Sequence, residues 1–354
     1  MDATHTEEPE RVLPAELPES EPTAYERERD AVSRIANARD KIRSELSKVI
    51  IGQLEVIDEL LIALLCGGHC LITGAPGLAK TLLVKSLAEL FHLRFQRIQF
   101  TPDLMPADIT GTEMIQETEH GREMMFQKGP IFANMVLADE INRTPPKTQA
   151  ALLEAMQEHQ VTAAGVSLPL EEPFFVLATQ NPIEMEGTYP LPEAQLDRFM
   201  FNIVIDYLDE DDEVTVVAQT TGMSGEKIEA LFAGSELREC HEVVRRVPVA
   251  EDVVRYAVRL AAASRPGRKG ADQFVNDYIN WGAGLRAAQF LILGGKTRAL
   301  LDGRTHVTVD DVQALAAPVL RHRILPNYRA EAEGVGVPEI IDHLLENVTT
   351  TLGS

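Results

Sequence analysis

The chain has 354 residues, of which 45% are hydrophobic, so it is long enough for about two domains with filled cores. Its net charge of −22 argues against broad binding to nucleic acid, which needs a basic surface, and favours proteins as partners. No apolar run reaches the roughly 18 residues that cross a membrane, and no basic-then-apolar signal segment stands at the start, so we expect a cytoplasmic protein.

A tail and two helices are expected to open the chain. Residues 1–25 are rich in Glu and Pro and poor in core-forming residues, which is typical of a disordered acidic segment. A helical pattern follows over 25–49, and a second one over 57–64, after a turn that contains Gly52 and Gln53.

The three cysteines are too few for a disulfide framework and suit a reducing compartment. Two of them, Cys66 and Cys70, flank a histidine in a pattern that superficially resembles a metal site. The hydrophobic pattern instead places Cys66 at the end of a helix and Cys70 within a strand, so we expect two buried thiols rather than a metal.

Between residues 69 and 205, short apolar runs alternate with helical patterns, which is typical of a parallel sheet flanked by helices. The expected strands are 70–73, 95–100, 135–138, 174–179 and 199–205. Two segments do not fit this alternation: 114–126 predicts a hairpin inserted within a helix, and 161–170 predicts a second hairpin before a core strand. We expect the exposed tips of both hairpins to be contact surfaces.

Strand signals disappear after residue 205, and the remaining chain predicts a helical region. Its expected helices lie near 211–222, 225–234, 251–263, 272–279, 285–302, 308–320 and 337–348. The acidic run 206–213 is expected to begin the first of them, where carboxylates favour the helix dipole, rather than to form a binding patch.

A phosphate-binding loop follows the first expected strand. The common pattern is Gly-x-x-x-x-Gly-Lys-[Ser/Thr], and the segment here reads Gly74-Ala75-Pro76-Gly77-Leu78-Ala79-Lys80-Thr81, with Ala79 in place of the second glycine. Gly74 and Gly77 allow backbone N–H groups to turn inward around an anion, and the helix that begins near Lys80 directs its positive end there. Lys80 would bind the outer phosphates of ATP, and Thr81 would bind its Mg²⁺ ion. The alternative is a plain Gly/Pro turn, but the strand–turn–helix context favours nucleotide binding.

Acidic and amide side chains follow two further strands. Asp139 and Glu140 end the apolar run 135–138, at the sheet edge where the phosphate loop opens. We expect Asp139 to hold hydrated Mg²⁺ and Glu140 to polarise a water molecule for attack on the γ-phosphate. Asn181 would hold that water after the next strand, although an Asn before Pro is also common in plain turns.

Together these motifs resemble those of MoxR-type AAA+ ATPases, within the group that carries a helix-2 insert and a pre-sensor-1 hairpin. The resemblance runs from about Ser44 to Arg323 and rests on four segments, residues 74–81, 139–156, 178–182 and 187–199. It implies a P-loop AAA+ core of α/β class followed by a separate all-α lid. The implied divisions are a tail at 1–25, a core at 26–205 with an insert at about 112–127 and a hairpin at about 160–171, and a lid at 206–354.

The resemblance implies a role for each matched residue. Lys80 and Thr81 would be the Walker A lysine and magnesium ligand, Asp139 and Glu140 the Walker B pair, and Asn181 the sensor-1 residue. Ala79 is usual in this family, so it does not indicate a dead site.

Three further roles come from the same resemblance. Gly52 and Gln53 match the turn that lies against adenine. Arg198 occupies the arginine-finger position, which reaches the γ-phosphate of a neighbouring subunit, although Asp197-Arg198 alone would suggest a surface ion pair. Arg286 matches the sensor-2 arginine, but Gly284-Leu285 replaces the Ser-Pro usual before it, and whether it acts on its own ATP or a neighbour's is open.

The family implies a ring, usually a hexamer, that hydrolyses ATP with Mg²⁺ and acts like a chaperone in remodelling or assembling partner proteins. Its clients often contain von Willebrand factor A domains. Alternatives are a nucleotide-dependent scaffold with slow turnover, a nucleic-acid motor and a magnesium-chelatase-like protein. The negative charge disfavours the motor, and no porphyrin site is visible for a chelatase.

Overall fold

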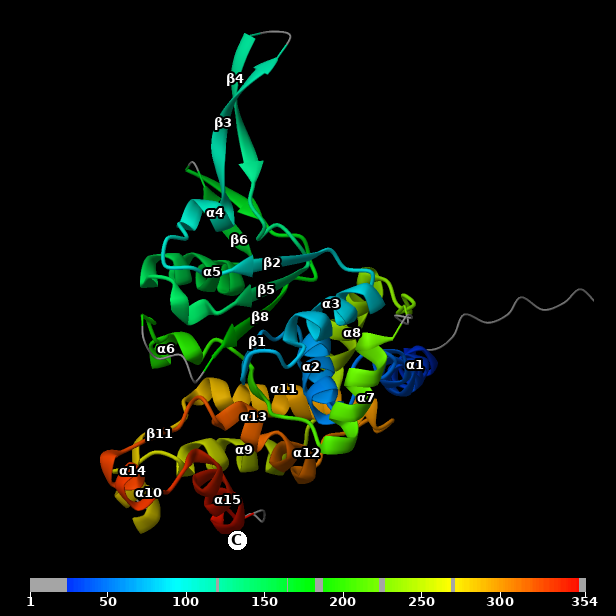
Figure 1. Ribbon diagram of the computed structural model, residues 1–354. Coiled ribbons are helices and arrows are strands. Elements are labelled where there is room, and N and C mark those ends of the chain that lie inside the picture. The colour runs from blue at the N-terminus through cyan, green and yellow to red at the C-terminus, as the bar shows by residue number, and fades with distance from the viewer. Residues whose placement is uncertain are drawn as a thin grey trace, which may run out of the picture.

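The computed structural model describes residues 24–118, 121–163, 165–181, 187–222, 227–268 and 271–349 (Figure 1). The expected acidic tail lies outside them, apart from its last residues, because the described chain begins at Ala24. No helix in the described part combines the length and apolar composition needed to cross a bilayer.

Five strands form one parallel sheet in the order β2-β5-β8-β1-β9. They are β1 (Cys70–Gly74), β2 (Phe95–Gln99), β5 (Met135–Asp139), β8 (Phe175–Gln180) and β9 (Phe201–Ile205). Each overlaps one of the expected strands, which confirms the predicted α/β core. Because all five run in the same direction, their carboxyl ends share one edge, and the chain segments that follow β1, β5 and β8 meet there.

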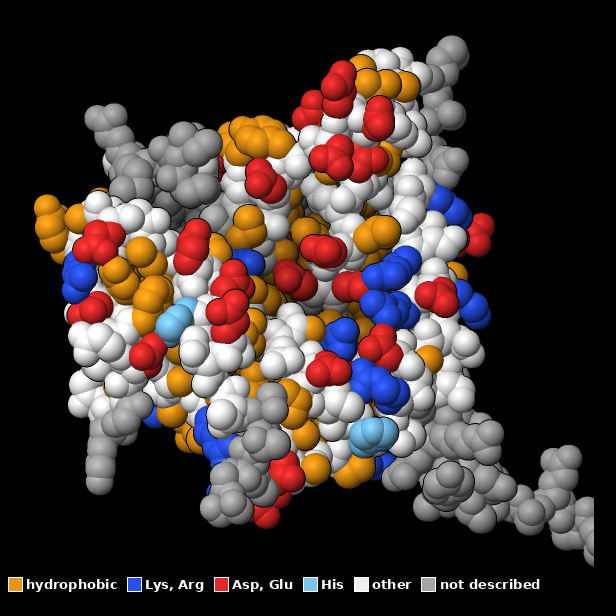
Figure 2. All heavy atoms as spheres, turned by 90° about the horizontal axis from the view of Figure 1, so that it is seen from below, with side chains coloured by type: hydrophobic (Ala, Val, Ile, Leu, Met, Phe, Trp, Pro, Cys, Tyr) orange, Lys and Arg blue, Asp and Glu red, His pale blue; other side chains and the backbone are white. Residues whose placement is uncertain are grey.

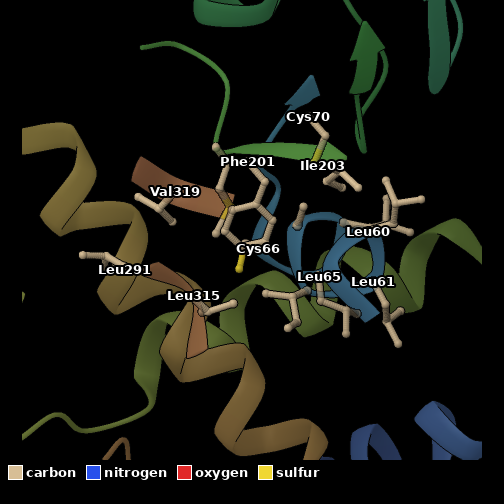
Figure 3. Packing of buried hydrophobic residues seen from close by; sticks show 14 of the residues in the cluster. Leu60, Leu61, Leu65, Cys66, Cys70, Phe201, Ile203, Leu291, Leu315 and Val319 are labelled. Atoms are coloured by element: carbon tan, nitrogen blue, oxygen red, sulfur yellow. The ribbon is translucent and has the colours of Figure 1, made fainter. Parts of the chain in front are cut away.

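The helices of the first half are α1 (Ala24–Leu46), α2 (Leu54–Cys66), α3 (Lys80–Leu90), α4 (Pro106–Thr110), α5 (Pro146–Glu158) and α6 (Glu193–Leu196). The helix α2 lies at the centre of the larger core, and every residue from Leu60 to Cys66 is buried. Figure 3 shows side chains of α2, β9 and the C-terminal helices gathered in one cluster. The sheet and the helical region therefore share a continuous hydrophobic core.

Cys66 and Cys70 occupy the positions expected from the sequence. Cys66 is the last residue of α2 and Cys70 is the first of β1, and both are buried thiols. Burial raises the pKa of Cys66 to about 12, although a hydrogen bond with Thr297 opposes the shift. Neither thiol has the exposed, electropositive surroundings that make cysteines reactive.

Two hairpins extend from the core. One pairs β3 (Gly111–Thr118) with β4 (Gly121–Lys128), and it projects from the body at the end opposite the C-terminal helices (Figure 1). A helix, α4, precedes this hairpin, but the chain returns from Lys128 to β5 without a second helical segment. The other hairpin pairs β6 (Gln160–Ala163) with β7 (Val166–Pro169), directly before β8.

After β9 the chain is mainly helical. The helices are α7 (Glu210–Thr221), α8 (Gly234–Arg246), α9 (Glu251–Ala263), α10 (Gln273–Tyr278), α11 (Leu285–Leu301), α12 (Val309–Ala314), α13 (Ala316–Leu320), α14 (Tyr328–Glu333) and α15 (Val337–Asn347). The prediction of a helix near 225–234 is wrong, because residues 227–233 are not helical and the helix begins at Gly234.

The expectation that strands end at residue 205 is also wrong. The short strands β10 (Ile279–Trp281) and β11 (Leu325–Pro326) form an antiparallel pair between helices. Runs of two and three residues are too short to show a period, and they are extended here because they pair with each other.

A buried carboxylate stabilises the C-terminal helices. Asp311 is fully buried and accepts hydrogen bonds from Arg298, Arg304 and the backbone N–H of Thr308, at 2.6, 2.6 and 2.9 Å. Burial alone would raise the pKa of Asp311, but these bonds outweigh it and hold the pKa at about 2.

We expect Asp311→Ala to lower the free energy of unfolding by about 2–4 kcal/mol, because it removes the buried acceptor of hydrogen bonds from Arg298, Arg304 and Thr308. The folded-state pKa lies below the ordinary 3.8, so the stabilisation is present above that pH and is lost as pH falls toward about 2. Urea unfolding at pH 7 and pH 3 would measure both effects. The exposed neighbour Asp310→Ala is the control and should change stability by less than about 0.5 kcal/mol; equal effects in the two variants would contradict the assignment.

Candidate functional site

The loop that joins β1 to α3 has the backbone of an anion-binding turn. Gly77 has φ 86° and Ala79 has φ 53°, both in the left-handed region. A Cβ added at Gly77 would meet nothing within 4 Å, so the backbone conformation and not space requires glycine there. Ala79 accepts a conformation that costs a residue with a Cβ about 1 kcal/mol or more, and α3 then begins at Lys80. The amino end of α3 and the turn of the loop therefore face the same space.

Lys80 is held at the base of this loop. Its Nζ donates a hydrogen bond to the carbonyl oxygen of Gly74 at 2.5 Å. Partial burial lowers the pKa of Lys80, while the carboxylates of Asp139 and Glu140 oppose the shift. The ammonium group is thus a cation facing two anions in a site that is partly shielded from water.

Asp139 ends β5 and accepts hydrogen bonds through both carboxylate oxygens. Its Oδ1 accepts a hydrogen bond from the Thr179 hydroxyl at 2.6 Å. Its Oδ2 accepts two from Arg97, from Nε at 3.0 Å and from Nη2 at 2.6 Å. The orientation of this carboxylate is therefore fixed by residues of the two neighbouring strands, β2 and β8.

Glu140 follows in a left-handed conformation, with φ 59°. Its Oε2 accepts hydrogen bonds from Gln99 Nε2 at 3.0 Å and from Arg143 Nη1 at 2.9 Å. Its backbone N–H donates to the Thr179 hydroxyl at 2.8 Å. Because that hydroxyl also donates to Asp139, Thr179 links the two acidic residues.

These groups line a single cavity of about 380 Å³. Its lining residues are Pro76, Gly77, Leu78, Ala79, Lys80, Thr81, Arg97, Asp139, Glu140, Thr179 and Asn181. The structure thus brings together the predicted phosphate loop, the acidic pair and Asn181, which is 8% exposed. Sequence reasoning missed Arg97, Gln99, Arg143 and Thr179; the first two are polar residues two positions apart, on one face of β2.

The donor set suits a nucleotide with Mg²⁺. Among the described residues, no cluster of three or more His, Cys, Asp and Glu side chains could hold a metal ion. Mg²⁺ characteristically takes only one or two protein oxygens and completes its shell with phosphate and water. Thr81 and Asp139 supply such oxygens beside the anion-binding loop, so the residues present fit the group.

Gly52 and Gln53 line a second cavity, of about 690 Å³, between α2 and the chain that leads into α7. Gly52 has φ 73°, which favours glycine, and a Cβ there would lie 2.2 Å from a carboxylate oxygen of Asp212, so that side chain would have to move. The Oε1 atom of Gln53 is buried and has no hydrogen-bond partner. An adenine amino group could supply the missing donor.

Arg198 and Arg286 do not line either cavity. Arg198 follows α6 and its Nη1 donates to the carbonyl oxygen of Leu153 at 2.8 Å. Arg286, at the start of α11, lies 3.5 Å from the carboxylate of Asp197. Asp197 also binds the buried Arg323 at 2.7 Å, so Arg286 lies where α6 meets the C-terminal helices, whereas Arg198 contacts α5. Neither arginine therefore contacts the phosphate loop or the Gly52–Gln53 turn in the described cavities of its own chain.

One face of the molecule is shown in Figure 2, seen from below the view of Figure 1. On it, the described Lys and Arg side chains are interspersed with Asp and Glu side chains and form no continuous basic surface. Such a face offers no broad platform for a phosphate backbone.

The chain is similar to known proteins over most of its length. Residues 69–201 match the family described as "ATPase family associated with various cellular activities (AAA)", and residues 271–344 match the AAA lid domain. Chaperone MoxR1 of Mycobacterium tuberculosis is 39% identical over 305 residues, which cover 86% of this chain and 80% of that protein. Protein MoxR of Paracoccus denitrificans is 30% identical over 317 residues, covering 84% and 91%. A crystal structure of a protein from Cytophaga hutchinsonii has a TM-score of 0.85 and 42% identity, covering 91% of this chain and 98% of its own.

Proposed function

Because the chain belongs to the MoxR family of AAA ATPases, we propose that it hydrolyses ATP with Mg²⁺ and uses the cycle to remodel or assemble partner proteins. The observation that carries the proposal is the single cavity lined by the phosphate loop, Asp139, Glu140 and Asn181. An anion cradle, an oxygen donor set for Mg²⁺ and a carboxylate beside an amide are the parts that phosphoryl transfer to water needs.

Each residue has a defined task in this scheme. The loop N–H groups and Lys80 bind the outer phosphates. Thr81 and Asp139 would hold the Mg²⁺ ion, which supplies positive charge to the phosphate oxygens. Glu140 accepts a proton from the attacking water, and the amide of Asn181 orients that water.

Completion of the site requires a second subunit. Neither Arg198 nor Arg286 lines the cavity of its own chain, yet phosphoryl transfer gains greatly from a positioned arginine. We place both arginines at the nucleotide of a neighbouring copy, in a head-to-tail ring that is a hexamer in this proposal. Arg286 accordingly acts in trans.

We propose a role for each segment of the chain, in order. Residues 26–205 would be the nucleotide-binding core, with the insert at about 112–127 and the hairpin at about 160–171 as contact surfaces, and 206–354 would be the lid. The proposed clients are proteins that contain von Willebrand factor A domains, and the name of Chaperone MoxR1 supports a chaperone-like role. A cytoplasmic location suits the three cysteines, which all remain thiols.

Assembly can be tested with the chain's single tryptophan. Trp281 lies five positions before Arg286 and is 67% exposed. If Arg286 faces a neighbouring copy, ATP should shift the Trp281 emission to shorter wavelength as the complex grows to several subunits by mass photometry, because the indole loses water.

Lys80→Ala is the control for this experiment, since it should bind ATP poorly and show neither change. Assembly without a change in Trp281 emission would remove Arg286 from the subunit contact. A protein that stays a monomer in ATP would contradict the ring.

A further inference from the structure

Arg97 lies on β2, the edge strand beside β5. Its guanidinium donates two hydrogen bonds to one oxygen of Asp139, and its Nη2 also donates to Gln99 Oε1 at 2.5 Å. Gln99 in turn donates to Glu140. Two side chains of β2 that share a face therefore bind both acidic residues of the site.

The hydrogen bonds that Asp139 accepts occupy most of the lone pairs with which it could bind a metal-bound water. Both hydrogen bonds from Arg97 reach Oδ2, which has two lone pairs, and the hydroxyl of Thr179 occupies Oδ1. The carboxylate is mostly buried, with 15% of its side chain exposed, so it needs a cationic partner. In this arrangement the partner is Arg97.

The Arg97 side chain is not enclosed by the core. It is 47% exposed, and it lines the cavity together with the phosphate loop. By contrast, Arg323 has a side chain that is 2% exposed and donates to several backbone carbonyls, so it is fixed in the core.

We propose that Arg97 is the resident counter-ion of Asp139, and that Mg²⁺ entering the site exchanges with its guanidinium for this carboxylate. The inference rests on the proposed function, because it concerns the same cavity. Without metal, Arg97 neutralises Asp139 and allows the anionic phosphates of a nucleotide to approach. With metal, the ion takes over that task and the guanidinium is released into the cavity.

The exchange predicts how nucleotide affinity depends on metal. Without Arg97, Asp139 would keep the Thr179 hydroxyl as a donor and Lys80 as the neighbouring cation. Less of its negative charge would then be neutralised when Mg²⁺ is absent, and repulsion of the phosphates would weaken binding. With Mg²⁺ present, Asp139 would be open to the ion, and affinity would hold or rise. The ratio of the Kd for ADP in EDTA to the Kd for ADP in Mg²⁺ therefore measures how much Arg97 contributes to nucleotide binding in the absence of metal.

Titration calorimetry with ADP on the full-length protein tests the exchange without any turnover. We expect Arg97→Gln to raise this ratio by about tenfold, chiefly through weaker binding in EDTA. Arg97→Lys keeps the charge and should stay close to wild type. Arg94→Gln is the matched control, because Arg94 lies three positions earlier and pairs with Glu171 outside the cavity.

The possible results separate the hypotheses. A ratio in Arg97→Gln that matches wild type, or equal weakening in both conditions, would overturn the exchange and leave Arg97 as a structural residue. If Arg97→Lys gave the same ratio as Arg97→Gln, the positive charge at position 97 would not be what supports binding in EDTA, and the exchange would be overturned. If wild-type protein bound no nucleotide in either condition, the proposed function itself would fail.

Discussion

Substituting Glu140 by glutamine is expected to lower ATP hydrolysis by about 10²–10⁴-fold while ATP still binds. The amide keeps the size of the carboxylate and can still pair with Gln99, but it cannot take a proton from water. Phosphate release at saturating ATP and calorimetric titration with ATP would measure the two properties separately. Glu154→Gln, on the exposed face of α5, is the control and should hydrolyse ATP at the wild-type rate.

Hydrolysis that persists in Glu140→Gln would show that Glu140 is not the base. A wild-type protein that binds ATP and assembles but turns over slowly would favour the scaffold alternative. The contacts of Glu140 with Gln99 and Arg143 give that alternative a physical basis, since both donors hold the carboxylate in place.

The same variant offers a test of the clients. Protein that binds ATP without cleaving it should remain in the client-bound state, because release would follow hydrolysis. A purified von Willebrand factor A domain protein should therefore co-sediment with Glu140→Gln in ATP and not in ADP. Equal binding in both nucleotides would argue against coupling of the client to the cycle.

The sheet and the chemical core of the site could be predicted from sequence because local patterns carry them. Apolar runs such as 135–138 mark strands buried on both faces, and the parallel direction then places Asp139 and the phosphate loop at one edge. The glycines before Lys80 mark positions where the turn needs a backbone conformation that other residues rarely adopt. Gly77, which is left-handed, is an example.

The missed features depend on partners far away in the chain. Residues 279–281 are extended because 325–326 pair with them, and nothing local marks either segment. Arg97 and Gln99 occupy exposed positions of an edge strand, where polar residues are ordinary. Their importance arises only from the register that sets Gln99 opposite Asp139. Arg198 and Arg286 are expected only from the family resemblance, because the nucleotide on which they are proposed to act belongs to a neighbouring copy.

Arg198→Ala is expected to lower ATP hydrolysis by about 10³–10⁵-fold and to leave ATP binding nearly unchanged, because Arg198 does not line its own chain's cavity. Phosphate release and ATP titration would measure the two effects. Arg246→Ala, an exposed arginine of α8 paired with Glu242, is the control and should match wild type. Loss of ATP binding in Arg198→Ala would instead make Arg198 a structural residue, acting through its bond to the Leu153 carbonyl.

Mixing two inactive variants tests whether Arg198 acts in trans. Glu140→Gln subunits carry an intact Arg198, and Arg198→Ala subunits carry an intact Glu140. In a head-to-tail ring assembled from equal amounts, about a quarter of the subunit contacts would combine the two intact residues and restore hydrolysis at those sites. If Arg198 acted within its own chain, every cavity in the mixture would lack one essential group, and the mixture would stay as inactive as its components.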